Sequence, residues 1–415
     1  MSIKFVFALC ALLVGGGRVC AQEAVRLAYV DALSGGGASV GVARLKAFQF
    51  IAEQMNAKGG IQGRKLEIVP FDNKTNAQES VLQTQKAIDS GIRFITQGNG
   101  SAFGVAISEF IAKYNDRNPG KEVLYFNYSA IDPVLVNEKC NFWHFAWDAN
   151  SDVKMEAIGN YIKKNAAIKK VYLINQDYSY GKSVRAAARE IIQSKRSDIE
   201  IVGDELHPFF KVTDFSPYIA KIQASGADSV ITGNWGQDLA LLLKAAGTLG
   251  LNVDWYTYYG VATAGIPITL KQVNLDHKVF GVVEGLANVD HASSRAFEAA
   301  WREKYGKDFV LYAPRQANEI IMFAKAVEEA KSFEPKDVAF ALEDMKFDVF
   351  NGGQGFMRKD DHQFFQPIYV ASTGALSKDE PFDEENTGWG NRVRAVIPAD
   401  QTLTKTTCQM KRPAR

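Results

Sequence analysis

The chain has 415 residues, with 48 lysines and arginines against 47 aspartates and glutamates, a net charge of +1. A composition this balanced offers nothing that would recruit nucleic acid or an anionic membrane surface electrostatically. After a predicted leader peptide about 390 residues remain, which is more than one hydrophobic core usually spans, so two lobes are expected.

Residues 1–21 have the pattern of a cleaved secretory signal peptide. A short basic segment ending at Lys4 precedes a ten-residue apolar stretch, and Val19-Cys-Ala21 places small or tolerated residues before a cleavage site, with Gln22 as the new N-terminus. About ten apolar residues are too few to span a bilayer, which takes about 20. A lipid anchor on Cys10 or Cys20 is the less favoured alternative. We therefore predict a periplasmic protein without direct membrane insertion.

From residue 25 onward, short apolar strands alternate with amphipathic helices. Strands are predicted over 25–31, 65–71, 93–96, 122–126 and 142–147, and helices over 42–55, 76–88 and 103–114. The second helix has a capping-box spacing, with Asn76 at its start and Glu79 three residues on. The alternation restarts with helices over 153–163, 183–194, 215–224 and 237–249, and strands over 169–174, 200–204, 229–232 and 253–258.

Such an alternation predicts an α/β fold with mostly parallel sheets that helices cover on both faces. Residues 293–345 are mainly helical, and a glycine-rich, hairpin-like segment over 350–356 and a last strand over 367–371 follow. The paired acids Glu384 and Glu385 lie in a polar run and are expected in a solvated loop.

Two of the four cysteines leave with the leader, and Cys140 and Cys408 remain. In an oxidising compartment two cysteines are expected to pair. Closing so long a loop would stabilise the fold by roughly 4–5 kcal/mol in the chain-entropy model. Two cysteines without clustered histidines do not make a zinc site, so no metal is expected.

Sequence signatures of catalysis are missing. Gly98, Gly100 and Gly104 faintly resemble a dinucleotide fingerprint, but the third glycine comes one position late. The chain has no Gly-x-Ser-x-Gly elbow, Walker loop, HExxH motif or kinase signature. We predict that the protein is not an enzyme and needs no cofactor.

Polar loops follow the predicted strands, at the edge where open α/β sheets bind their ligands. The most informative is the segment from Tyr172 to Gly181, where a buried strand ends in a loop with two tyrosines. Similar loops carry Ser34 after the first strand and Asn99 after the third. Hydroxyls, amides, backbone N–H groups and aromatic rings gathered in this way indicate a site that holds a small molecule without transforming it.

Seven segments along the chain match one family in order: Ser34-Gly35, 56–66, 71–74, Ser129 to Pro133, Asp177 to Gly181, Ala224 to Asp228 and Asp361-His-Gln363. Over residues 25–374 the chain resembles the periplasmic solute-binding proteins of branched-chain amino-acid type ABC transporters. These Leu/Ile/Val-binding proteins are type I periplasmic binding proteins, also called Venus flytrap receptors.

The resemblance implies two lobes, each a mostly parallel sheet flanked by helices, with three hinge crossings near residues 147, 281 and 365. The N-terminal lobe would comprise residues 22–147 and 282–365. The C-terminal lobe would comprise residues 148–281 and 366–400, and a C-terminal tail would cover 401–415.

The resemblance also implies where the ligand carboxylate binds. The family holds it with a serine after the third strand, a place that Ser101 or Ala102 fills. It also uses a turn after the fourth strand, which here is Ser129-Ala130 with Ile131 where a threonine hydroxyl would be. The carboxylate-binding part of the site is thus mostly kept.

The ammonium-binding part is mostly lost. Tyr180 and Trp235 match the family's aromatic positions in the second lobe, but Tyr259 stands in place of the acid that binds the ammonium, and Val40 in place of an aromatic residue. A tyrosine is neutral at pH 7 and cannot balance a buried ammonium as a carboxylate does.

We therefore expect a monomeric receptor that closes over a small organic acid or amide, aromatic or apolar, and hands it to an ABC permease in the inner membrane. Trp147 and Phe103 are further rings that could stack on a flat ligand. One alternative is a neutral or branched-chain amino acid, with its ammonium held by cation–π contacts and carbonyls. Another is a ligand sensor that signals to a partner.

Overall fold

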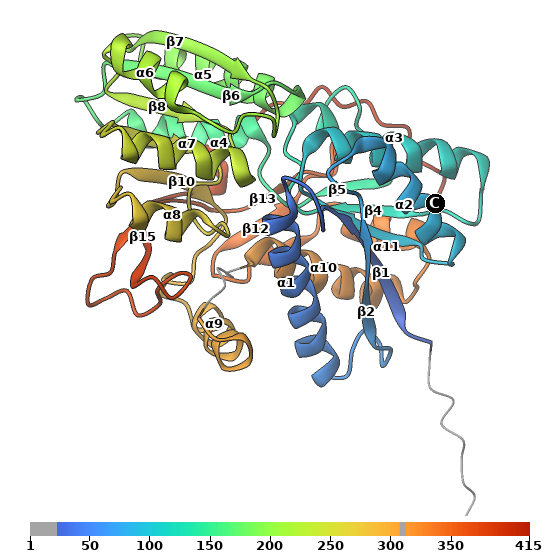
Figure 1. The fold of residues 1–415 in the computed structure, drawn as a ribbon. Coiled ribbons are helices and arrows are strands. Elements are labelled where there is room, and N and C mark those ends of the chain that lie inside the picture. The colour runs from blue at the N-terminus through green and yellow to red at the C-terminus, as the bar shows by residue number, and fades with distance from the viewer. Residues whose placement is uncertain (1–22, 308–312) are drawn as a thin grey trace, which may run out of the picture.

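Two sheets organise the chain in the computed structural model, which describes residues 23–307 and 313–415 (Figure 1). The predicted leader and its cleavage site lie outside the described residues. The first sheet has five parallel strands in the order β2-β1-β3-β4-β5. Its strands are β1 (Val25–Asp31), β2 (Leu66–Asp72), β3 (Phe94–Gln97), β4 (Leu124–Asn127) and β5 (His144–Ala146).

Helices cover this first sheet in two layers and form the first lobe with it (Figure 1). One layer contains α1 (Ala38–Ala57), α10 (Pro314–Ala330) and α11 (Pro335–Leu342), and the other α2 (Ala77–Asp89) and α3 (Ser101–Arg117). α9 (Ala292–Tyr305) joins the same core, because Phe297 and Trp301 meet the ring of Phe50 edge-on. Apolar side chains of the strands and of these helices form one buried cluster.

The second sheet has seven strands in the order β15-β14-β10-β9-β8-β6-β7 and forms the second lobe. Its strands are β6 (Lys170–Gln176), β7 (Glu200–His207), β8 (Ser229–Thr232), β9 (Asp254–Thr257), β10 (Val279–Val283), β14 (Ile368–Ala375) and β15 (Trp389–Ile397). β14 pairs antiparallel with both β10 and β15, and the other neighbouring strands pair parallel. Helices α4 (Ser151–Ile162), α5 (Ser179–Lys195), α6 (Ser216–Ser225), α7 (Gly236–Thr248) and α8 (Ile266–Gln272) flank it.

A small antiparallel sheet of β11 (Lys346–Asp348), β12 (Gln354–Met357) and β13 (Phe364–Phe365) completes the fold, with 3-10 turns η1 (Pro133–Val136) and η2 (Ala399–Gln401). The predicted two-lobe α/β fold is confirmed. The chain passes between the sheets after β5, after β10 and after β13. β10 continues to Val283, two residues beyond the predicted crossing at 281. Within the described residues, no helix combines the length and apolar character that a membrane span requires.

Two local predictions were wrong and one was half right. The strand predicted last, over 367–371, is β14, and β15 follows it as the edge of the sheet. Glu384 is not solvated but buried, and its Oε1 accepts a hydrogen bond of 2.7 Å from Asn391. Asn76 caps α2 by accepting from the Glu79 N–H at 3.0 Å, but the Glu79 carboxylate accepts from Gln83 and does not complete the box.

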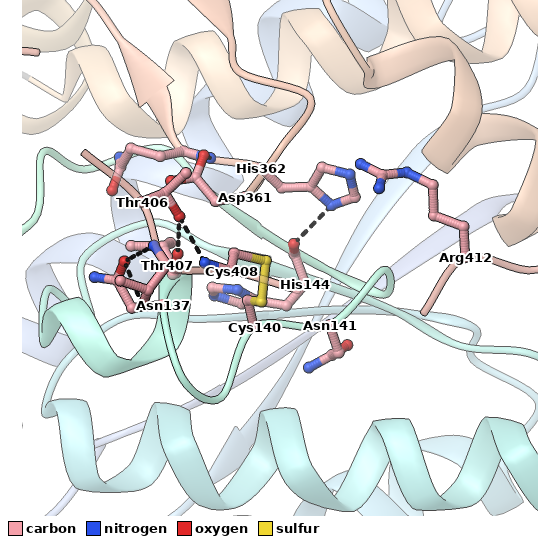
Figure 2. Close-up of a disulfide and its surroundings, with 12 residues drawn as sticks. Asn137, Cys140, Asn141, His144, Asp361, His362, Thr406, Thr407, Cys408 and Arg412 are labelled. Atoms are coloured by element: carbon pink, nitrogen blue, oxygen red, sulfur yellow. Dashed lines mark hydrogen bonds between the residues drawn. A yellow bond between two sulfur atoms is a disulfide. The ribbon is translucent and has the colours of Figure 1, made fainter. Parts of the chain in front are cut away.

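The predicted disulfide is confirmed: Cys140 and Cys408 are bonded, with Cα atoms 5.7 Å apart (Figure 2). The tail leaves β15 in the second lobe and ends against the first lobe, where Figure 1 marks the C-terminus. Thr407 N–H donates to Asn137 Oδ1 at 2.9 Å, and Arg412 donates to Glu343 at the same distance. The tail is therefore held on the first lobe by a covalent bond and by polar contacts.

Candidate binding site between the lobes

A pocket lies between the two lobes, with about 400 Å³ of empty space that includes open solvent at its mouth. Nearly all of its wall comes from loops and helix starts that follow strands β1, β3 and β4 in the first lobe and β6, β8 and β9 in the second. The lining residues are Val40, Arg44, Asn99, Gly100, Ser101, Ser129, Ile131, Tyr178, Tyr180, Trp235, Tyr259, Thr263 and Arg315. This is the edge of the sheets at which α/β folds bind ligands.

Seven of the ten residues predicted to bind ligand line this cavity: Asn99, Ser101, Ser129, Ile131, Tyr180, Trp235 and Tyr259. The other three, Ser34, Ala102 and Ala130, are not part of its wall. Ser34 Oγ instead donates to Asp72 Oδ2 at 2.7 Å, which fixes the loop between β1 and α1. Contact of the seven residues with a ligand stays a prediction.

Two further rings suggested by the sequence have other roles. Trp147 is fully buried in the first-lobe core, where its Nε1 donates to the sulfur of Met322 at 3.2 Å and its ring meets Phe126 edge-on. Phe103 packs over Gly100, the residue that precedes α3 and has a φ of +92°. The ring leaves no space for a side chain at position 100, since a Cβ there would lie 2.5 Å from a carbon of the ring. Neither ring lines the cavity, so the structure gives no support to the suggestion that they stack on a ligand.

Asp31, at the end of β1, arranges the loops of the first lobe and was not predicted. Its Oδ2 accepts hydrogen bonds from the N–H groups of Gly98 and Asn99 at 2.9 and 3.1 Å, and from the hydroxyl of Tyr128 at 2.6 Å. Burial raises the pKa of Asp31, although the hydrogen bonds from Tyr128 and the backbone counteract it. One buried carboxyl thus positions the loop after β3 against the end of β4.

Aromatic side chains form the wall contributed by the second lobe. Trp235 Nε1 donates to the hydroxyl of Tyr178 at 2.8 Å, and Tyr178 stacks on Phe209 with ring centroids 4.4 Å apart. Tyr180 and Tyr259 lie 6.3 Å apart between centroids. Burial raises the pKa of Tyr178, Tyr180 and Tyr259 well above its usual value, so these hydroxyls are neutral. This wall combines large apolar faces with uncharged hydrogen-bonding groups.

A buried cluster of four charges, the ion quartet, lies at the hinge beside the cavity. It comprises Asp148, Lys154, Glu284 and Arg315. Lys154 Nζ is 2.8 Å from Asp148 Oδ1 and 2.7 Å from Glu284 Oε1, while Arg315 pairs with Asp148 through Nη1 and lies 3.6 Å from Glu284 through Nε. Two cations face two carboxyl groups, so the quartet carries no excess negative charge. Its members come from both lobes and from the connections that follow β5 and β10.

The pKa values within the quartet diverge. Burial, together with the negative charge of Asp148, raises the pKa of Glu284 to about 7. Burial also acts to raise the pKa of Asp148, but the charges of Arg315 and Lys154 outweigh it and hold that pKa below its usual range. Asp148 is therefore the carboxyl group of the quartet that is ionised at pH 7. The hydroxyl of Tyr259 lies 3.4 Å from Asp148 Oδ2 and can donate a hydrogen bond to it.

Arg44, on α1, brings a second guanidinium to the wall and was also not predicted. Its Nη2 donates to the carbonyl of Ala262, in the second lobe, at 3.2 Å. Burial, and then the like charge of Arg315, lowers the pKa of Arg44 to about 10. No carboxylate among residues 23–307 and 313–415 forms an ion pair with it.

Comparison with known proteins shows which family this chain belongs to. The model of a family described as periplasmic binding protein matches residues 24–378. A protein of Brucella abortus named Leu/Ile/Val-binding protein homolog 4 is 32% identical over 418 residues, which cover 98% of this chain and 97% of that protein.

Solved structures extend the comparison. A leucine-, isoleucine-, valine-, threonine- and alanine-binding protein from Brucella ovis, in a closed conformation, has a TM-score of 0.83 at 30% identity, with 94% of this chain and 100% of that chain covered. A solute-binding protein of an ABC transporter from R. palustris, in complex with benzoate, has a TM-score of 0.76 at 15% identity, covering 93% and 99%. The second likeness concerns the fold alone.

Proposed function

Since the chain belongs to the family of periplasmic binding proteins, we propose that it is the receptor of an ABC importer for a small organic acid or amide with an aromatic or apolar body. The predicted leader would bring it to the periplasm, and an ABC permease would receive the ligand. Closure of the two lobes over the cavity is the step that this role requires, and the cavity is already bounded by both lobes.

The observation that carries the proposal is the composition of the cavity wall, to which the described residues contribute four aromatic side chains and no carboxylate. An amino acid would bury its ammonium here, and a buried ammonium needs a negative partner. The nearby carboxylates Asp148 and Glu284 already pair with Lys154 and Arg315. An acid or amide lacks the ammonium, and its apolar body fits the rings of Tyr180 and Trp235.

A branched-chain amino acid is the second candidate, because the 32% identical relative is named as a homolog of a Leu/Ile/Val-binding protein. Benzoate is a suitable probe for the first candidate, since a protein of the same fold has been solved with it. The two candidates differ in the ammonium, so benzoate and leucine separate them directly.

Calorimetry and thermal melts with benzoate and leucine test the proposal. A ligand at a hundredfold excess over its Kd should stabilise the protein by about 2.7 kcal/mol. We expect this shift with benzoate and a smaller one with leucine. Trp235→Ala should abolish the benzoate shift while the protein still folds, because it removes a ring that faces the cavity.

Two further variants sharpen this test. Trp389→Ala is the matched control: Trp389 is a half-buried tryptophan at the start of β15 outside the cavity wall, so benzoate should still shift its melting temperature. Tyr259→Glu should weaken benzoate binding by bringing a like charge close to the acid. Tight binding of leucine that Trp235→Ala leaves unchanged would overturn the proposal.

A further inference from the structure

We propose that Arg44 binds the carboxylate of the ligand and makes the site selective for an acid over the corresponding amide. This inference rests on the proposed function and decides between the two ligand classes that it leaves open. It names a residue that is not part of the seven matching segments and that lies in the first half of α1.

The charge of the cavity wall is the first argument. Its charged side chains are Arg44 and Arg315, both guanidinium groups. Asp148 and Glu284 both pair with Lys154 and Arg315, so the ion quartet adds no excess negative charge to the cavity. The positive charge of Arg44 therefore has no carboxylate partner among the described residues at the cavity. A closed, partly desolvated site with one surplus cation favours a ligand with one negative charge.

The second argument is the hydrogen-bonding capacity of Arg44. A guanidinium has five N–H donors in a planar fork that suits a carboxylate. One Nη2 bond to Ala262 is formed within the described residues, and the side chain is 7% exposed. Donors that face a cavity without a protein acceptor can be satisfied by a ligand oxygen. Arg315 has fewer donors to offer, because it also bonds Ser129 Oγ at 3.0 Å besides its two carboxylates.

The third argument is that α1 holds Arg44 rigidly. Gly41, one turn earlier, lets the helix press on the end of β1: a Cβ at this position would lie 1.7 Å from the carbonyl oxygen of Ala32. The hydroxyl of Tyr29 also donates to the carbonyl of Gly41 at 2.8 Å. A guanidinium on so fixed a helix is preorganised, which reduces the entropy lost on binding.

Arg44 also reaches from the first lobe to Ala262 in the second. A carboxylate bound at this point would therefore be held where the two lobes meet. The aromatic body of the ligand would extend towards Trp235 and Tyr180, which line the second-lobe side of the cavity.

The test measures Kd by calorimetry for three pairs of acid and primary amide: benzoate and benzamide, 3-phenylpropanoate and 3-phenylpropanamide, hexanoate and hexanamide. Wild-type protein should bind at least one acid about 10- to 100-fold more tightly than its amide, the range expected for hydrogen bonds to a charged group. Arg44→Met should remove this preference by weakening the acid and leaving the amide within about threefold.

Arg26→Met is the matched control, because it removes an equal charge from β1, where Arg26 donates to the carbonyl of Ser90 away from the cavity. It should keep the full preference for the acid. If wild-type protein binds each acid and amide alike, or if Arg44→Met keeps the preference, the inference is wrong and the proposed function stands. If no member of the three pairs binds, the proposed function itself fails. Should Arg44→Met not fold, the wild-type comparison and Arg44→Gln decide.

Discussion

Removal of the disulfide between Cys140 and Cys408 should cost several kcal/mol of folding free energy and leave ligand binding intact. The bridge joins residues 268 positions apart. For a closed loop of this length the chain-entropy model gives about 5.6 kcal/mol, and loss of a native disulfide typically costs about 2–5 kcal/mol. Contacts such as Arg412 to Glu343 keep the tail on the first lobe without the bond. We therefore expect about 3–5 kcal/mol.

The measurement is urea unfolding of the wild type and of Cys140→Ser/Cys408→Ser, followed by both fluorescence and circular dichroism, since two lobes need not unfold together. Wild-type protein in a strong reductant should shift towards the double variant. Denatured, unreduced wild type should show no thiols at these two positions. Neither cysteine lines the cavity, so the Kd for benzoate should be the same in both proteins. An unchanged urea midpoint in the double variant would refute the reasoning.

Three further predictions concern buried charges. Lys154→Met leaves Asp148 and Glu284 with Arg315 alone and should destabilise the fold by about 3–5 kcal/mol in urea unfolding; a loss below about 1 kcal/mol would contradict it. Burial, and then His362, lowers the pKa of His144 to about 3, so its stabilisation is complete above pH 6.5 and is lost as the pH falls towards 3. Between pH 8 and pH 5 the wild type should lose about 2 kcal/mol of unfolding free energy through His144, and His144→Gln should lack this part of the loss. An equal loss in variant and wild type would count against this prediction. Burial raises the pKa of Glu319 to about 8, so its contribution is complete below pH 4.5 and is lost as the pH rises to 8. Glu319→Gln should gain up to about 3 kcal/mol over the wild type between pH 4.5 and pH 7, as measured by urea unfolding at both pH values.

The alternation of strands and helices could be predicted from the sequence because local periodicity determines it, and the order of elements up to β9 follows the prediction. The elements that were missed depend on distant contacts. α8 spans seven residues, too short for a clear period, and the carboxylate of Glu385 accepts from the N–H groups of Gly265 and Ile268 at its start. β15 alternates apolar and basic residues, but it follows an acidic segment that looked like a solvated loop.

The loops of the site were predicted because polar residues that follow strands of a parallel sheet meet at one edge. The arginines were missed because they lie within helices. A local signal for Arg44 nevertheless exists: Val40, Arg44, Ala47, Phe48 and Ile51 follow the spacing of one helix face, and all five are buried. A charged residue on the apolar face of a predicted helix is therefore a candidate for a site, because charged side chains are rarely buried without a partner.

A charged residue on an apolar helix face can have a structural role or can bind a ligand, and this pattern alone does not distinguish the two. The presence or absence of a neutralising partner within the protein does distinguish them. Lys154 and Arg315 are buried on helices, and both have carboxylate partners in the ion quartet. Glu319 can avoid its buried charge by holding a proton, as its raised pKa indicates. Arg44 has neither means: a pKa of about 10 keeps it charged at pH 7, and no carboxylate among the described residues pairs with it. We propose that the ligand supplies the partner that offsets this burial, and the cavity that Arg44 lines is where such a ligand would enter.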